Sequence, residues 1–273
     1  MKVLFVCTGN TCRSPLAEGY LKNKNLPCLE VQSAGLMPDG VKASQNSILA
    51  AKTFGFDISG HKPRQITSDL ILNSDKIYCM SESHKSALAG IVPESKLSVL
   101  GSGIPDPYGL DLDYYIKTAE KIMAATDNIF ADILPADKKD CADIEVIERT
   151  CFSAPWSRSA IEQSLDNGTV MYKAVLKGKT VGYIGINTVL DEGYITNIGI
   201  LPEFRRNGTA QRLLEKLECD YKEKLSFISL EVRVSNLAAI SLYKKLGYQK
   251  AGERRSFYIN PTENALIMTK GLK

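Results

Sequence analysis

Residues 1–15 of the chain read MKVLFVCTGNTCRSP, an apolar run that leads into a polar loop and then into Ser-Pro. The apolar and β-branched residues of Lys2–Val6 predict a buried strand, and Ser14-Pro15 is typical of the first turn of a helix. Cys7 and Arg13 stand at the two ends of the loop, six positions apart. A buried strand that passes through a polar loop into a helix predicts the first step of a parallel α/β sheet.

The rest of the first half continues this alternation of strands and helices. Further strands are predicted at Leu29–Gln32, Lys76–Met80 and Leu97–Leu100, and helices from about Ser14, over Ser44–Phe54 and over Leu112–Phe130. Strands alternating with helices form parallel sheets with helices on both faces. The sequence therefore predicts an α/β fold with a four-stranded parallel doubly wound sheet, whose functional residues lie at the carboxyl ends of the strands.

The pattern changes at about residue 132. Helices are predicted at Asp143–Cys151, Ser157–Leu165, Gly208–Lys222 and Leu237–Leu246, and strands at Met171–Leu176, Thr180–Asn187, Tyr194–Ile200, Phe227–Val234, Tyr248–Ala251 and Ala265–Met268. This mixture predicts a second, mixed α+β domain. We place the domains at 1–131 and 132–273. Ile129–Pro135 either ends the last helix of the first domain or forms the first strand of the second.

Composition limits the possible partners and compartments. The 273 residues are enough for two hydrophobic cores of ordinary size. The 34 basic and 31 acidic residues give a net charge of +3 without a polybasic block, which argues against binding to nucleic acid or to a membrane surface. The N-terminus lacks the features of a signal peptide, and no apolar run approaches the roughly 20 residues of a membrane span. We therefore expect a soluble, cytoplasmic protein.

The numbers and spacing of cysteines and histidines limit the possible metal sites and catalytic schemes. The seven cysteines are scattered without paired CxxC spacing, which fits a reducing cytosol and argues against a structural zinc site. The sequence predicts no bound metal. The chain has only two histidines, His61 and His84, which weakens any catalytic scheme that needs imidazole as a base or ligand.

The loop after the first strand has the composition of a phosphate-binding site. Its small and polar residues can turn their backbone N–H groups inward, with a helix N-terminus behind them. The same field favours the thiolate of Cys7, which can attack phosphorus, while the planar fork of Arg13 holds two phosphate oxygens. Asn10 and Ser14 are expected to brace the loop and to hydrogen-bond the thiolate. The predicted phosphate-binding residues are Thr8, Gly9, Asn10, Thr11, Cys12, Arg13 and Ser14.

A phosphatase of this kind also needs an acid for the leaving group, which later serves as a base for water. Asp106 in Asp106-Pro107-Tyr108 is the candidate, and Tyr108 is expected to form part of the wall beside the leaving group. The structural alternative is that Cys7 is a buried cysteine at a strand end, Arg13 a solvated charge and Asp106 the start of an ordinary turn. The combination of these residues favours the functional interpretation.

Residues 1–130 resemble the low-molecular-weight protein tyrosine phosphatases. The resemblance rests on the Cys7–Pro15 loop, Ser33-Ala34-Gly35, Asp57-Ile58-Ser59-Gly60-His61 and Asp106-Pro107-Tyr108. It implies that Cys7 is the nucleophile, Arg13 the transition-state clamp and Asp106 the general acid. It also implies a reversible protective disulfide between Cys7 and Cys12.

The resemblance does not determine which type of phosphorylated side chain is the substrate. Thr11 occupies a loop position where tyrosine phosphatases of this group usually carry an aliphatic residue and the related bacterial protein arginine phosphatases carry threonine. Phosphotyrosine and phosphoarginine therefore both remain candidate substrates. Arsenate reductases share the fold and the loop but need an additional cysteine pair after the third strand, where only Cys79 is found, so arsenate reduction ranks lower.

The second half contains a candidate cofactor loop. Asn197–Phe204 runs into Arg205-Arg206-Asn207-Gly208-Thr209-Ala210, an R-x-x-G-x-A pattern that precedes a predicted helix. Small residues at Gly208 and Ala210 let backbone N–H groups approach a pyrophosphate at the helix N-terminus, and the two arginines add positive charge. The predicted loop ligands are Arg205, Arg206, Asn207, Gly208, Thr209 and Ala210.

Two further segments carry a family resemblance. They are Leu230-Glu231-Val232-Arg233-Val234-Ser235-Asn236 and Ala239-Ile240-Ser241-Leu242-Tyr243, with Cys151–Ser157 upstream. Residues 132–273 resemble the GNAT superfamily and, within it, the ribosomal-protein alanine N-acetyltransferases. The resemblance implies acetyl-CoA as co-substrate, Glu231 as base through water and Tyr243 as acid. It further implies cofactor contacts from Asn236 and from the backbone of Ile198, Gly199 and Ile200.

Amine acetylation requires a base for the ammonium group and an acid for the departing thiolate, and Glu231 and Tyr243 fit these two roles. The structural alternatives are an exposed strand charge for Glu231 and a packed aromatic ring for Tyr243. Trp156 is more typical of an acceptor-side or core anchor than of a catalyst.

The hypothesis is a bifunctional enzyme with two separate active sites. Its partners would be a phosphorylated protein and a protein with a free N-terminal amine, with ribosomal protein S18 as a candidate acceptor. The alternative is that only one domain is catalytic and the other is a binding or structural module.

Overall fold

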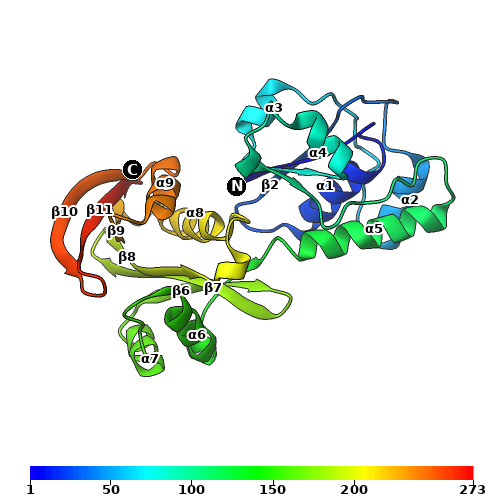
Figure 1. Ribbon diagram of the computed structural model, residues 1–273. Coiled ribbons are helices and arrows are strands. Elements are labelled where there is room, and N and C mark those ends of the chain that lie inside the picture. The colour runs from blue at the N-terminus through cyan, green and yellow to red at the C-terminus, as the bar shows by residue number, and fades with distance from the viewer. Residues whose placement is uncertain (273) are drawn as a thin grey trace. The chain divides into compact units, whose positions relative to one another are not determined.

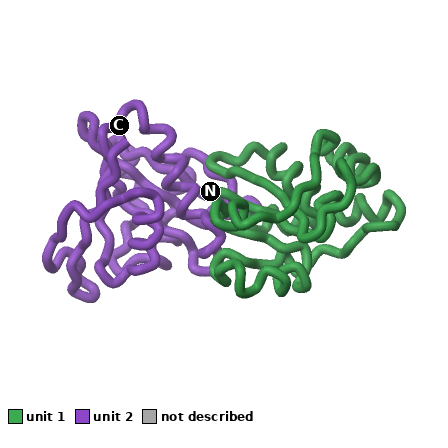
Figure 2. Tube along the Cα trace, turned by 90° about the horizontal axis from the view of Figure 1, so that it is seen from above, with its two compact units in different colours: residues 1–130 green, residues 131–273 purple. Residues whose placement is uncertain are grey.

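The chain forms two compact units. A computed structural model describes residues 1–272 and divides the chain into Met1–Phe130 and Ala131–Lys273 (Figures 1 and 2). Among residues 1–272, no helix has both the length and the apolar character needed to cross a membrane.

The first unit is built on a parallel sheet with the strand order β2-β1-β3-β4, which confirms the predicted four-stranded architecture. Its strands are β1 (Lys2–Cys7), β2 (Glu30–Gly35), β3 (Lys76–Cys79) and β4 (Leu97–Val99). Its helices are α1 (Arg13–Lys24), α2 (Gln45–Thr53), α3 (Ser68–Asn73), α4 (Glu82–Leu88) and α5 (Leu112–Asp127), with a 3₁₀ turn at Glu94–Lys96. Helices α3 and α4 were not predicted, because six and seven residues are too few for a helical period to stand out.

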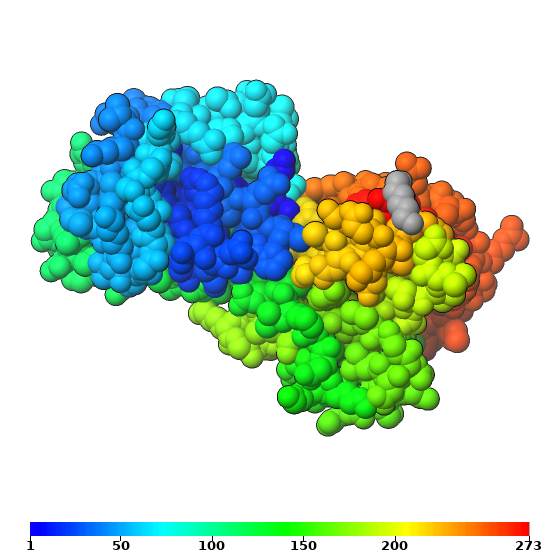
Figure 3. Space-filling model, turned by 180° about the vertical axis from the view of Figure 1, so that it is seen from behind, coloured from blue at the N-terminus to red at the C-terminus, as the bar shows by residue number. Residues whose placement is uncertain are grey.

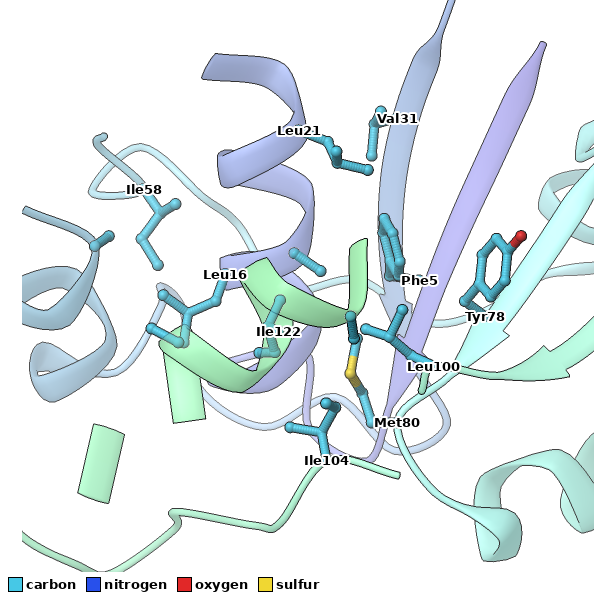
Figure 4. Close-up of a cluster of buried hydrophobic side chains, with 14 of the residues drawn as sticks. Phe5, Leu16, Leu21, Val31, Ile58, Tyr78, Met80, Leu100, Ile104 and Ile122 are labelled. Atoms are coloured by element: carbon cyan, nitrogen blue, oxygen red, sulfur yellow. The ribbon is translucent and has the colours of Figure 1, made fainter. Parts of the chain in front are cut away.

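Strand β1 shows why the sheet is covered on both faces. Val3, Phe5 and Cys7 belong to a core with α1, α2 and α5, whereas Leu4 and Val6 belong to a second core on the other face. Side chains of successive strand residues point to opposite faces, so a strand apolar at every position is buried on both. Figure 4 shows the larger core.

The second unit is built on a seven-stranded sheet with the order β10-β11-β9-β8-β7-β6-β5. Its strands are β5 (Asp132–Pro135), β6 (Val170–Leu176), β7 (Lys179–Val189), β8 (Glu192–Ile200), β9 (Phe227–Arg233), β10 (Gln249–Tyr258) and β11 (Glu263–Gly271). Only β8 and β9 pair in parallel. The predicted mixed α+β fold is confirmed, and Ile129–Pro135 ends in a strand of this sheet because β5 pairs with β6.

Two pairs of helices cover this sheet on opposite faces (Figure 1). The helices are α6 (Cys141–Cys151), α7 (Arg158–Asp166), α8 (Thr209–Tyr221) and α9 (Leu237–Lys245), with 3₁₀ turns at Lys138–Asp140 and Pro202–Phe204. The helices α8 and α9 share one core with the sheet, and α6 and α7 share another. In the space-filling view, the gold atoms of α8 reach the surface of this unit (Figure 3).

The closing hairpin is longer than predicted. Strands β10 and β11 have ten and nine residues, whereas the sequence indicated only Tyr248–Ala251 and Ala265–Met268. The outer part of β10 reads GERRS and lacks apolar alternation, so its strand conformation comes from pairing with β11.

Candidate active sites

The first candidate site lies at the carboxyl end of β1. Cys7 is the last residue of that strand, and the loop of residues 8–12 connects it to α1. The Cys7 Sγ atom lies 3.0 Å from the Ser14 Oγ atom and accepts a hydrogen bond of 3.3 Å from the backbone N–H of Asn10. Asn10 adopts a φ of 54°, in the left-handed region, which allows the loop to turn back toward the sulfur.

The side chain of Asn10 holds the loop in this shape. Its amide nitrogen donates to the Oγ atoms of Ser14 at 2.9 Å and Ser33 at 2.8 Å, and its Oδ1 atom accepts from the backbone N–H of Arg64 at 3.0 Å. Gly35 permits the close approach of β2, because a Cβ atom there would lie 2.5 Å from the Thr8 carbonyl oxygen. Contacts within the protein therefore hold the loop in this shape.

Arg13 and Asp106 are 93 residues apart in sequence and form an ion pair in this site. The Arg13 Nη2 atom lies 2.5 Å from the Asp106 Oδ2 atom, and Arg13 Nη1 donates to the Ile104 carbonyl at 3.3 Å. The Arg13 side chain is 6% exposed and that of Asp106 is 49% exposed. Asp106 therefore stands at the solvent side of the loop, and the side chain of Tyr108, next but one in the chain, is exposed.

Both histidines of the chain contact this loop, and neither contact was predicted from the sequence. His84 Nε2 lies 2.9 Å from Thr8 Oγ1 and its Nδ1 lies 2.6 Å from Ser81 Oγ. His61 Nε2 lies 3.0 Å from the Asn10 carbonyl oxygen. Burial lowers the pKa of both rings, and for His84 the positive charge of Arg13 adds to the effect.

Cys12 lies behind the loop. Its Sγ atom is 3.4 Å from Ser44 Oγ and 3.6 Å from the Tyr115 hydroxyl, and burial, with a smaller effect from Cys12, raises the pKa of Tyr115 to about 12. Cys7 and Cys12 are both free thiols in this structure. Thr11 is partly exposed, and its carbonyl accepts from the Ser44 backbone N–H at 2.9 Å.

The second candidate site begins where β8 and β9 separate. The two strands pair only from Glu192 to Tyr194, although β8 continues to Ile200. Over its last residues β8 pairs with β7 alone, and β9 pairs with β11. An irregularity between Ile184 and Ile186 of β7 marks a bulge where β8 turns away. One edge of the predicted cofactor segment Ile198–Ile200 therefore faces a gap in the sheet.

The loop that follows β8 leads to the N-terminus of α8. Gly208 has a φ of 81° and no side chain with which to cap the helix. Within Thr209–Tyr221, all of which the structure describes, the first turn carries no acidic side chain. An uncapped helix N-terminus favours an anionic ligand, so these residues fit the pyrophosphate of a coenzyme A derivative.

The two loop arginines have different surroundings. Arg205 Nε donates to the Ile200 carbonyl at 2.8 Å and so fastens the loop to the end of β8. Arg206 is exposed and has a φ of 70°. Asn236 lies in a turn beyond β9, where its Oδ1 atom caps α9 by accepting from the Ala239 N–H at 3.2 Å.

Glu231 and Tyr243 lie on opposite faces of the sheet. On β9, Ile228, Leu230 and Val232 belong to the core that contains α8 and α9, so the alternating side chain of Glu231 faces the side of α6 and α7. Tyr243 belongs to the α8 and α9 core and is 5% exposed. Burial raises its pKa, which keeps its hydroxyl protonated.

One contact of Glu231 was not predicted, and Trp156 lies in a separate set of contacts. Arg254 of β10 forms an ion pair with Glu231, with Nε 3.1 Å from Oε1. Trp156 is fixed through its backbone N–H, which donates to Glu148 Oε2 at 2.8 Å. Glu148 is fully buried and also accepts from Asn197 at 2.7 Å. The Trp156 side chain lines a pocket of about 460 Å³ beside α7 and the end of β7.

Comparisons with known proteins match the two parts of the chain to two different families. The sequence model of the family described as low molecular weight phosphotyrosine protein phosphatase matches residues 2–139, and that of the GNAT acetyltransferase family matches residues 141–248. A protein-arginine-phosphatase from Geobacillus stearothermophilus is 32% identical over 138 residues, which cover 47% of this chain and 93% of that protein.

The second unit has relatives of its own. A ribosomal protein bS18 alanine N-acetyltransferase from Escherichia coli (strain K12) is 34% identical over 127 residues, which cover 45% of this chain and 84% of that protein. The crystal structure of the ribosomal-protein-S18-alanine N-acetyltransferase from Escherichia coli matches with a TM-score of 0.50 and 29% identity, covering 53% of this chain and 95% of the other.

The chain therefore belongs to the low molecular weight phosphotyrosine protein phosphatase family through its first unit and to the GNAT acetyltransferase family through its second. Both are families of enzymes, and GNAT acetyltransferases use acetyl-CoA.

Proposed function

We propose that the chain is a bifunctional enzyme with one active site in each unit. The first site would hydrolyse a phosphorylated protein side chain, and the second would acetylate the N-terminal alanine of a protein. The observation that carries the proposal for the first unit is the convergence of Cys7, Arg13 and Asp106 on one braced loop. For the second unit it is the gap between β8 and β9 beside the uncapped start of α8.

In the first site, the Cys7 thiolate attacks phosphorus and displaces the leaving group, which takes a proton from Asp106. The resulting phosphocysteine is then hydrolysed by water, which gives a proton to Asp106 and releases inorganic phosphate. Arg13 and the inward N–H groups of the loop balance the charge on the phosphoryl oxygens. The hydrogen bonds from Ser14 and Asn10 stabilise the thiolate as attacking and as leaving group.

Thr11 supports phosphoarginine as the substrate. By the family resemblance it occupies the loop position where protein arginine phosphatases carry threonine, and one relative with 32% identity carries the name protein-arginine-phosphatase. A hydroxyl beside the reacting group can accept a hydrogen bond from a guanidinium N–H, which an aliphatic side chain cannot do. Phosphotyrosine is the second candidate, supported by the family match.

The test compares phosphate release from phosphoarginine and phosphotyrosine peptides by the wild type, Thr11→Ile and Cys7→Ser. We expect Cys7→Ser to be inactive on both. Loss of phosphoarginine activity in Thr11→Ile, with phosphotyrosine activity kept, would support the arginine assignment. A preference for phosphotyrosine in both the wild type and Thr11→Ile would favour the tyrosine assignment instead.

In the second site, acetyl-CoA supplies the acetyl group as a thioester. The loop Arg205–Ala210 and the start of α8 would hold the pyrophosphate, and the free edge of Ile198–Ile200 would align the pantetheine chain. Glu231 would take a proton from the acceptor ammonium group, through water, on the face of α6 and α7. Tyr243 would give a proton to the leaving thiolate from the opposite face.

This part is tested by measuring CoA release with a peptide that begins in alanine, with the amine blocked in a control peptide. We expect Glu231→Ala and Tyr243→Phe to slow turnover strongly. Activity of both variants equal to the wild type would refute the assigned roles. A wild type active in only one of the two assays would support the alternative in which the other unit is a binding or structural module.

A further inference from the structure

Arg233 makes several polar contacts around the open end of the second site. It follows Glu231 by two positions on β9, so both side chains point to the face of α6 and α7. It stands at the end of β9, beyond the point where β8 has separated. Neither the cofactor loop nor the proton-transfer roles proposed above involve it.

The guanidinium of Arg233 binds the turn between β10 and β11. Its Nη1 atom donates to the Pro261 carbonyl at 3.0 Å and lies 3.1 Å from Glu263 Oε2, and its Nη2 atom donates to the Asn260 carbonyl at 2.9 Å. Glu263 in turn accepts from the backbone N–H of Ser235 at 2.6 Å. One side chain thus joins the end of β9 to the turn of the hairpin.

The same guanidinium reaches the connection between α6 and α7. Its Nη2 atom donates to Ser153 Oγ at 2.9 Å, and its central carbon lies 4.3 Å from the centre of the Tyr258 ring. The side chain is only 21% exposed, although residues around it are solvent-accessible. A planar guanidinium has several N–H donors and can also stack on an aromatic ring, so it can bridge segments in this way. A lysine ammonium cannot.

These contacts surround the face from which an acceptor amine must arrive. The uncapped start of α8 belongs to the opposite face, so a cofactor anchored there enters the gap from that side. The acceptor must then approach Glu231 between the α6–α7 connection and the β10–β11 turn. Arg233 is the residue that fastens these two segments to each other.

We propose that Arg233 is a positioning residue that fixes the acceptor-binding walls of the acetyltransferase site. The inference rests on the proposed function of the second unit. Arg233 would act in binding of the protein N-terminus and not in cofactor binding or proton transfer. Its partners Ser153, Asn260 and Pro261 lie on the acceptor side.

The test uses Arg233→Lys in the full chain, which keeps the charge and removes the fork, with Arg149→Lys as control. Arg149 has an exposed side chain and pairs with Glu145 within α6. With a peptide beginning in alanine as acceptor, we expect the KM for the peptide to rise about tenfold or more in Arg233→Lys. The KM for acetyl-CoA and kcat should stay within about twofold, and Arg149→Lys should match the wild type.

A second measurement separates this proposal from the proposed function. Hydrogen exchange of backbone amides in residues 152–157 and 259–264 should become faster in Arg233→Lys and stay unchanged in Arg149→Lys. Unchanged exchange, or equal rises in both KM values, would overturn the positioning role. A wild type that fails to acetylate the peptide would defeat the proposed function, while the exchange data would still decide whether Arg233 fixes these segments.

Discussion

The guanidinium of Arg13 and the carboxylate of Asp106 meet at 2.5 Å although 93 residues separate them in sequence. Both groups are assigned separate tasks in the proposed phosphatase reaction, one on the phosphoryl oxygens and one on the leaving group. In this structure they form an ion pair. In the proposed reaction, a phosphate group would replace the carboxylate on Arg13 and leave Asp106 free to face the leaving group.

The first prediction concerns Asp106 as the acid. Asp106→Asn should lower kcat for phenyl phosphate by about 10²-fold or more, because phenolate leaves poorly without a proton. The effect on p-nitrophenyl phosphate should be much smaller, since its leaving group is stable as an anion. Asp113→Asn, an exposed residue at the start of α5, is the control. An equal fall with both esters would contradict the acid role.

The second prediction follows from the ion pair itself. Asp106→Asn should strengthen inhibition by inorganic phosphate by roughly threefold to tenfold, because Arg13 no longer has a competing carboxylate beside it. The Asp106 side chain is half exposed, so solvent screening keeps the effect modest. The test is to measure the inhibition constant of phosphate for the wild type and the variant at one ionic strength. Weaker inhibition in Asp106→Asn would show that the carboxylate does not compete.

The third prediction concerns pH and stability. Burial lowers the pKa of His61 and His84 below the usual value of 6.5, so the unfolded chain takes up protons before the folded chain does. Stability should be intact above about pH 7 and should fall as the pH drops through about 6.5. His84→Gln should reduce this slope when urea unfolding is followed at pH 7.5, 6.5 and 5.5. An unchanged slope would mean that protonation of His84 does not contribute to the pH dependence of stability.

The fourth prediction concerns Tyr243. Tyr243→Phe keeps the buried ring and removes the hydroxyl, so kcat of acetylation should fall by about 10²-fold while thermal stability changes little. Because burial raises the pKa of this hydroxyl, its ionisation should not limit the rate below pH 10. Tyr221→Phe at the far end of α8 provides the matched control. Full activity of Tyr243→Phe would assign the acid role to another group.

The fifth prediction concerns the left-handed turn before α8. Gly208→Ala should lower the free energy of unfolding by about 1 kcal/mol, because an L-residue at a φ of 81° is strained, and it should raise the KM for acetyl-CoA. Gly168→Ala is the control, since Gly168 has a φ of 92° with open space around it. It should show a similar loss of stability with an unchanged KM. If the two variants had the same KM, the loop would not bind the cofactor.

Most of the architecture could be predicted from local patterns. The apolar run of β1 and the alternation of strands with helices indicated the four-stranded parallel sheet, because burial on both faces leaves a continuous apolar signature. The short helices α3 and α4 and the outer half of β10 could not be found in this way. The two helices depend on their capping residues, and the outer half of β10 depends on pairing with β11. Neither leaves a periodic pattern in the sequence.

The sequence by itself determined which chemical groups are available: a cysteine and an arginine in one loop, an Asp-Pro-Tyr segment, and a glycine-containing loop before a helix. These are local features, and local spacing is what a sequence records directly. Only the tertiary structure decided that Asp106 contacts Arg13, that both histidines contact the loop after β1, and that Arg233 joins two distant segments. Such contacts arise where strand ends and loops converge, and the sequence separations of 27 to 93 residues between those partners leave no periodic trace.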